Sequence, residues 1–180
     1  WLKGNYPTEF MAAVLSSDMD NTDKLLVFLD DVKDMGIKML PPCVNHSLSM
    51  FSVVESGVIR YGLSAIKGLG GQLAEELVKA RSNEPFNHLL SVCIAAEKIN
   101  RKQLEALVKA GACDVFGHSR GVLLGSIDTA LQTASQQANN QKLGQQDLLG
   151  EDTVDFNYMS APELPNLIKL SYEKETLGYY

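Results

Sequence analysis

The chain has 180 residues, 45% of them hydrophobic, and a net charge of −6 from 16 basic and 22 acidic side chains. This composition excludes disorder of the whole chain and, taken at face value, argues against nucleic acid as a partner. No stretch approaches the roughly 20 apolar residues that cross a bilayer, and no signal-peptide pattern is present, so we expect a soluble, intracellular protein with no membrane partner.

The first third of the chain predicts two helices and a small β-hairpin. The helices are expected at Pro7–Leu15 and Thr22–Met35, where apolar residues recur at helical spacing. Thr8 is placed to be the N-cap of the first helix, and Gly36 ends the second. Proline at position 41 makes its predecessors extended, and the sequence Glu55-Ser56-Gly57 predicts a turn between two strands. The extended segments are expected at residues 37–40, 50–54 and 58–61.

The middle of the chain contains an internal repeat. The segment from Gly68 to Arg81 aligns without a gap with the segment from Lys98 to Gly111, and the sequence LVKA occurs in both at equivalent positions. Gly70 is aligned with Asn100. Because Gly and Asn most readily adopt the left-handed backbone conformation, the pair predicts the same backbone requirement in both turns. Helices are expected at about 63–66, 71–80, 87–95, 101–110 and 119–134.

Positive charge is concentrated in the segment that holds the repeat. Residues 60–120 carry 9 basic and 6 acidic side chains, whereas residues 1–59 carry 4 and 8, and residues 121–180 carry 3 and 8. Phosphate binding depends on the local field more than on the total charge. An acidic chain with a basic hairpin module can therefore still bind DNA.

The two turns of the repeat are candidate phosphate-binding hairpins, because a tight turn followed by a helix with free N–H groups suits an anion. The candidate DNA-binding residues are Lys67, Gly68, Leu69, Gly70 and Gly71 in the first turn, and Lys98, Ile99, Asn100, Arg101 and Lys102 in the second. Lys98 replaces the first glycine and closes the backbone approach in the second turn. The alternative is a pair of helical hairpins that only pack, with their lysines in solvent.

The composition changes towards the C-terminus. Residues 132–146 include six glutamines and two asparagines, which predicts a fraying helix end and then a linker. Residues 151–165 are acidic and predict an extended strap, and a last helix is expected from about Asn166. Within the linker, one short motif either suits a pocket on a partner or contains two incidental leucines. This motif consists of Gln145, Gln146, Asp147, Leu148 and Leu149.

The sequence predicts no self-sufficient catalytic or metal site. Asp18 and Asp20 lie just before a predicted helix, where acidic side chains cap the N-terminus, and the spacing of a calcium loop is absent. The three histidines are scattered and have no partners at a recognisable spacing. Cys93 and Cys113 lie among apolar residues, as expected for buried thiols in a reducing compartment.

Several stretches of the sequence resemble the alpha subunits of bacterial DNA polymerase III, the C-family replicative polymerases. These stretches are YPTEFMAA at 6–13, SDMDNT at 17–22, MGIKMLPP at 35–42, YGLSAIKGLG at 61–70 and EKETLG at 173–178. The resemblance covers essentially the whole chain in order. Because the chain starts with Trp and stops within a periodic stretch, we expect it to be a piece of a longer protein.

The resemblance implies a mainly α fold: a helical fingers segment with a small β-hairpin, a tandem helix-hairpin-helix domain, and a partly extended strap with a final helix. It places the end of the fingers region at 1–60, the DNA-binding module at 61–115, a helix and polar linker at 116–140, a sliding-clamp motif at 141–150, and a strap and helix before an OB domain at 151–180.

The resemblance also implies partners for this segment. They are duplex or primer-template DNA at the two hairpins, the sliding clamp at Gln145–Leu149, and other domains and subunits of the polymerase III holoenzyme. Leu149 stands where the family often has phenylalanine. The parent enzyme is expected to use Mg, but its catalytic aspartates lie upstream, so we expect no cofactor, metal or catalytic residue in this segment. The implied location is the bacterial cytoplasm, at the nucleoid during replication.

Two hypotheses follow. The leading one is a non-catalytic segment of a DNA-directed DNA polymerase that holds duplex DNA and tethers the clamp, which supports processive template-directed synthesis by the parent. The alternative is a structural segment whose hairpins pack against other polymerase domains without DNA contact. A repair-type enzyme would need a catalytic constellation that the sequence does not provide.

Overall fold

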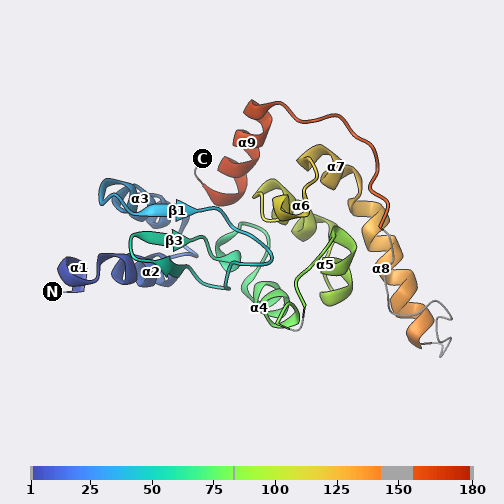
Figure 1. Ribbon diagram of the computed structural model, residues 1–180, viewed down its shortest axis with the longest axis horizontal. Helices are drawn as coiled ribbons and strands as arrows, with labels where there is room; N and C mark the ends of the chain where they lie inside the picture. The colour runs from blue at the N-terminus through green and yellow to red at the C-terminus, as the bar shows by residue number, and fades with distance from the viewer. Residues whose placement is uncertain (1, 83, 143–155, 179–180) are drawn as a thin grey trace.

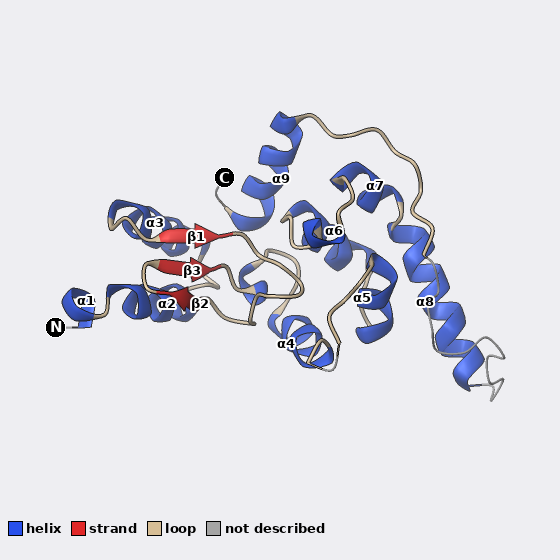
Figure 2. Cartoon of the chain, in the orientation of Figure 1, coloured by secondary structure: helices blue, strands red, loops and turns tan. Residues whose placement is uncertain are grey.

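The chain folds into a small sheet flanked by helices, followed by a helical module (Figure 1), in a computed structural model that describes residues 2–82, 84–142 and 156–178. The strands are β1 (Lys38–Leu40), β2 (Ser52–Glu55) and β3 (Val58–Arg60). The helices are α1 (Leu2–Asn5), α2 (Pro7–Ser17), α3 (Thr22–Asp34), α4 (Gly71–Ala80), α5 (Leu89–Ala95), α6 (Arg101–Lys109), α7 (Arg120–Gly125), α8 (Ile127–Lys142) and α9 (Asn166–Leu177), with 3-10 turns η1 (Leu63–Ala65) and η2 (Asp114–Phe116). Figure 2 shows the strands confined to one end of a mainly helical protein, which confirms the predicted fold class.

The predicted β-hairpin is present, but it belongs to a three-stranded sheet. β2 pairs antiparallel with β3, and β1 pairs parallel with the other side of β3, with Met39 opposite Ile59. The sequence predicted that residues 37–40 are extended but gave no partner for them. Ile59 on the central strand is fully buried, so the third strand completes the cover of this part of the core.

The caps of the first two long helices differ from those predicted. Pro7 is the first residue of α2 and Tyr6 precedes it, so the prediction that Thr8 is the N-cap is wrong. Thr8 is buried instead, and its Oγ1 accepts a hydrogen bond of 3.0 Å from the N–H of Gly57 in the β2–β3 turn. At α3 the cap is Asn21, whose side chain accepts from Lys24 N at 3.2 Å. The N-cap is therefore a neutral amide, whereas acidic side chains were predicted to cap this helix.

Two helices of the repeat region were predicted closely. α4 has the predicted bounds, and α6 ends one residue earlier than predicted. The segment expected as a helix at 63–66 is only the 3-10 turn η1, because its chain turns directly into the first hairpin.

The helix predicted over 119–134 is two helices, α7 and α8, separated at Ser126. The Ser126 Oγ donates to Val122 O at 2.8 Å and accepts from Met159 N at 2.8 Å, so it ends α7 and also holds the segment that returns over it. The expectation of a fraying end from residue 132 is also corrected, since α8 continues to Lys142. Leu131 and Ala134 pack against the core, which stabilises this polar stretch as helix.

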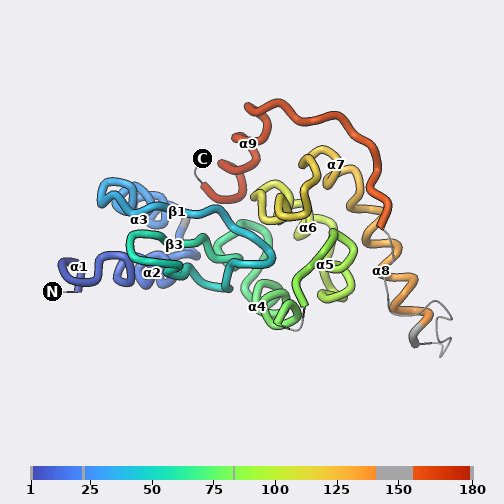
Figure 3. Tube along the Cα trace, in the orientation of Figure 1, coloured from blue at the N-terminus to red at the C-terminus, as the bar shows by residue number. Residues whose placement is uncertain are grey.

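The last described part of the chain returns from α8 past α7 to α9, as Figure 3 shows. Residues 156–165 have no regular secondary structure, as expected for a strap, and we use this name for them. The strap passes so close to α7 that a Cβ on Gly121 would lie 2.3 Å from Pro162 O. Tyr158 Oη accepts a 3.0 Å hydrogen bond from Leu89 N, so the strap is fixed to α5 as well.

In the ranges that the structure describes, no helix combines the length and apolar character that crossing a bilayer requires.

Candidate nucleic-acid interface

The two turns of the repeat fold as equivalent hairpins with buried tips. In the first hairpin (residues 67–71) the N–H of Leu69 donates to Ile66 O at 3.2 Å, and in the second (residues 98–102) the N–H of Ile99 donates to Ala96 O at 2.9 Å. Leu69 is fully buried and Ile99 is 7% exposed. These two predicted site residues therefore anchor the turns in the core, and their side chains are not available to a ligand.

The first hairpin depends on glycine. Gly70 precedes α4 with φ 85° and ψ 142°, a conformation that is essentially restricted to glycine, and Gly68 has φ 88°. Gly68 also faces α6, because a Cβ there would lie 3.9 Å from Ala106 Cβ. Gly68, Gly70 and Gly71 are exposed, and they have no side chains that could cover the backbone of the turn.

The second hairpin begins its helix in a different way. Asn100 has φ −102° and ψ 169°, which is extended backbone, so the prediction that Gly70 and Asn100 share a left-handed conformation is wrong. Asn100 Oδ1 accepts from Gln103 N, and Gln103 Oε1 accepts from Asn100 N, each at 3.0 Å. This reciprocal capping box explains why asparagine occupies the position: it serves as an N-cap through its side chain.

Gln103 also ties the two hairpins together. Its Nε2 donates to Leu69 O in the first hairpin at 3.0 Å. The equivalent position of the first copy is Leu73, so the departure from the repeat creates the bridge. Gln103 was not among the predicted site residues, although the spacing Asn-x-x-Gln at a helix start signals the capping box. The bridge itself joins residues 34 apart and has no local signal.

Both hairpins present free backbone donors. Within the described part of the chain, the N–H groups of Gly70 and Gly71 have no hydrogen-bond partner, and neither do those of Arg101 and Lys102. All four residues are exposed, and each pair lies at the start of a helix, α4 or α6. Free N–H groups at a helix start attract an anion both by hydrogen bonding and through the helix dipole.

The candidate cations fall into two groups. Lys67, Lys98 and Lys102 are exposed, and no ion pair involves them among the described residues. Arg101 is already occupied: its Nε lies 2.8 Å from Glu105 Oε1, and its Nη1 pairs with Asp128 of α8. The hydrogen bonds that Arg101 donates, first to Asp128 and then to Glu105, raise its pKa.

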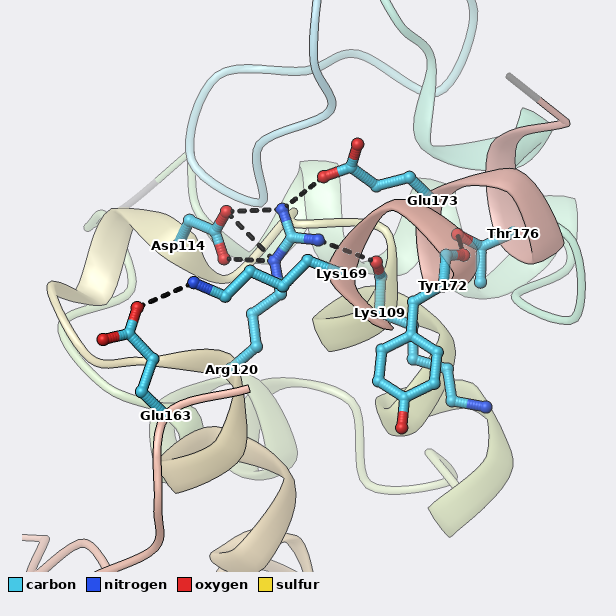
Figure 4. A network of polar contacts seen from close by, with 8 residues as sticks. All are labelled: Lys109, Asp114, Arg120, Glu163, Lys169, Tyr172, Glu173 and Thr176. Carbon is cyan, nitrogen blue, oxygen red and sulfur yellow. Dashed lines mark hydrogen bonds and ion pairs between the residues drawn. The ribbon is translucent and has the colours of Figure 1, made fainter. Parts of the chain in front are cut away.

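A charge network around the buried Arg120 fixes α9 beside the hairpin module (Figure 4). The guanidinium of Arg120 lies 2.8 Å from a carboxylate oxygen of Asp114 and 2.8 Å from Glu173 of α9, and it donates to Lys109 O at 3.3 Å. Burial opposes the charge, but the hydrogen bonds and negative charge of Asp114 and Glu173 outweigh it, so the pKa of Arg120 is raised. Arg120 was not among the predicted site residues, because its partners are distributed over three segments of the chain.

The end of α9 reaches the first hairpin directly. Lys67 N donates to Thr176 O at 2.9 Å, and Tyr61 Oη donates to Leu177 O at 3.1 Å. The backbone N–H of Lys67 is therefore used within the fold, and only its side chain is available to a ligand.

The remaining candidates lie elsewhere or outside the described residues. The predicted clamp motif, Gln145, Gln146, Asp147, Leu148 and Leu149, belongs to residues 143–155, which the structure does not describe.

Cys93 is buried, and burial raises its pKa to about 12, which fits an inert thiol. Across residues 2–82, 84–142 and 156–178 no group of three or more His, Cys, Asp or Glu side chains is placed to hold a metal ion.

Paired hairpins of this form are typical of the helix-hairpin-helix motif. The family model described as the helix-hairpin-helix motif matches residues 36–123. The whole chain is also 40% identical to parts of proteins named DNA polymerase III subunit alpha from Vibrio cholerae, from Xylella fastidiosa and from Escherichia coli K12. It spans 16% of the length of these relatives. The chain is homologous to one segment of the DNA polymerase III alpha subunits, which confirms the resemblance seen in its sequence.

Proposed function

We propose that this segment binds the phosphate backbone of duplex or primer-template DNA through both hairpins. One observation supports the proposal above the others: two turns, joined by the Gln103–Leu69 hydrogen bond, present free N–H groups beside unpaired lysines. Two phosphates could then be bound in a fixed relation to each other. Backbone donors and lysine side chains contact phosphates without reading bases, so the binding is independent of sequence and strongly dependent on salt.

The proposed role in the parent is to hold DNA during template-directed synthesis by a DNA-directed DNA polymerase. The relatives are named DNA polymerase III subunit alpha, and this chain would bind DNA in such an enzyme without contributing to catalysis. The catalytic aspartates and Mg would belong to other parts of the parent. The parent would act in the bacterial cytoplasm, at the nucleoid. Gln145–Leu149 would bind the sliding clamp and add processivity through tethering.

The DNA contact is tested by a salt titration of the 180-residue chain with duplex DNA. Neutralising roughly 3 to 5 phosphates gives a slope of log K against log salt of about −3 to −5. A triple variant with glutamate in place of Lys67, Lys98 and Lys102 is expected to bind duplex DNA at least about tenfold more weakly at ~0.1 M salt. Its slope of log K against log salt is expected to be smaller in magnitude by roughly 2 to 3. Fluorescence anisotropy with a labelled duplex measures both.

The matched control carries the same three charge reversals at Lys3, Lys33 and Lys38, which are exposed and lie in the N-terminal part of the chain. It changes the net charge equally and is expected to retain most of the affinity. Equal losses in the two triple variants would contradict the hairpin proposal. The packing alternative predicts no DNA binding and, when the hairpin lysines are reversed in the parent, looser docking of its domains.

The clamp contact is tested by alanine at Gln145 and Leu148. Loss of the glutamine and of one large apolar side chain is expected to abolish capture by the cognate clamp in surface plasmon resonance and to leave duplex binding unchanged. Alanine at Gln136, an exposed residue of α8, is the control. Undiminished capture by the double variant would exclude this motif as the clamp contact.

A further inference from the structure

The cation at the second hairpin is held by an acidic residue from another helix. Arg101 is the first residue of α6, and Asp128 is the second residue of α8, 27 positions later. The ion pair therefore joins the predicted phosphate site to a helix that takes no part in the hairpin. Neither the helix-hairpin-helix motif nor the repeat requires such a pair, since the first copy has Gly71 at the position of Arg101.

We propose that Asp128 competes with DNA phosphate for Arg101 and thereby lowers the affinity of the second hairpin for DNA. The proposal rests on the function proposed above and assigns Asp128 a regulatory part in it. In the free protein the guanidinium is bound to Asp128. On DNA it exchanges this carboxylate for a phosphate that is bound at the free N–H groups of Arg101 and Lys102.

The exposure of the pair makes this exchange feasible. The side chains of Arg101 and Asp128 are 55% and 60% exposed, and an ion pair in solvent contributes little to stability. The contrast is Arg120, whose side chain is 10% exposed and bound by carboxylates on two sides. Arg101 can leave its partner without disturbing the fold, whereas Arg120 cannot.

Asp128 and Arg101 are each stabilised near their present positions after the exchange. Asp128 lies in the first turn of α8, where the helix dipole stabilises a negative charge without Arg101. Glu105, one turn along α6, keeps its contact with the Nε of Arg101 and leaves the Nη groups to turn towards a phosphate. The guanidinium thus remains at the start of α6, where the phosphate is expected.

The test compares Asp128→Asn with the unchanged chain in the same duplex titration. The variant is expected to bind roughly three- to tenfold more tightly at ~0.1 M salt with an unchanged salt slope, because Arg101 contacts one phosphate on DNA in both chains and only the competing carboxylate is lost. In the Arg101→Gln background, Asp128→Asn is expected to have a much smaller effect, because its carboxylate then has no guanidinium to occupy.

Asp30→Asn is the matched control, since it removes one exposed carboxylate from α3 in the N-terminal part of the chain. An equal gain from Asp30→Asn, or a full gain from Asp128→Asn without Arg101, would show a general charge effect and overturn the proposal. Unchanged affinity of Asp128→Asn with normal binding by the parent chain would overturn it and leave the proposed function standing. Absence of duplex binding by both chains would overturn both.

Discussion

Alanine in place of Gly70 is expected to remove most of the duplex affinity while the protein stays folded. The φ and ψ of Gly70, 85° and 142°, cost a residue with a Cβ about 1–3 kcal/mol. No atom lies within 4 Å of the Cβ that alanine would add, so the penalty comes from the backbone alone. The hairpin can relieve it only by turning the N–H groups of Gly70 and Gly71 away from their present directions. We expect a loss of at least about tenfold in DNA affinity, since two donors to one phosphate are misdirected.

Two controls separate this effect from general strain. Gly57, in the β2–β3 turn, also has a positive φ of 78° and open space around a new Cβ. Alanine there is expected to lower stability in urea unfolding without changing DNA affinity. Asn100→Gly at the equivalent position of the second hairpin removes the side-chain cap but imposes no backbone strain, and is expected to cost only a few tenths of a kcal/mol. Normal DNA binding by Gly70→Ala would exclude the first hairpin as a phosphate contact.

The different behaviour of Gly70 and Asn100 shows where the repeat was a good guide and where it failed. The alignment located both hairpins and both following helices, because apolar spacing and turn residues are local signals. It suggested one backbone conformation for both turns. In the structure the two helices begin in different ways: α4 follows a glycine with positive φ, and α6 begins with a capping box. Aligned residue types do not distinguish an asparagine that adopts a left-handed backbone conformation from one whose side chain caps a helix.

Long-range contacts account for most of what the sequence did not predict. The pairing of β1 with β3, the break at Ser126 and the length of α8 all depend on contacts with distant parts of the chain. Arg101 was predicted as a cation for phosphate, and its residue type and position supported this. Its pairing with Asp128 changes its expected contribution, and only the fold brings these two side chains together.

Methionine in place of Arg120 is expected to lower the free energy of unfolding by about 3 kcal/mol, the low end of the loss found when one partner of a buried ion pair is removed, because the carboxylate of Asp114 is half-exposed. Methionine fills most of the same volume but leaves the carboxylate of Glu173 and the carbonyl of Lys109 without their donor. Glu173 lies on α9, so the contact of this helix with the hairpin module is weakened. Urea unfolding followed by circular dichroism measures the loss.

Release of α9 in the Arg120 variant should also change hydrogen exchange locally, in a way that a uniform loss of stability would not. Lys67 N donates to Thr176 O at the end of α9, so release of α9 exposes this amide to solvent. Hydrogen exchange at Lys67 should therefore accelerate more than exchange at Leu69, whose N–H is bound within its own turn. Lys169→Met is the matched control, because Lys169 also lies on α9 and forms an ion pair, with the exposed Glu163 of the strap, whose loss should change stability little. If both variants unfolded at the same urea concentration, α9 would not depend on the Arg120 network, and the first hairpin would be held by its own turn and by Gln103.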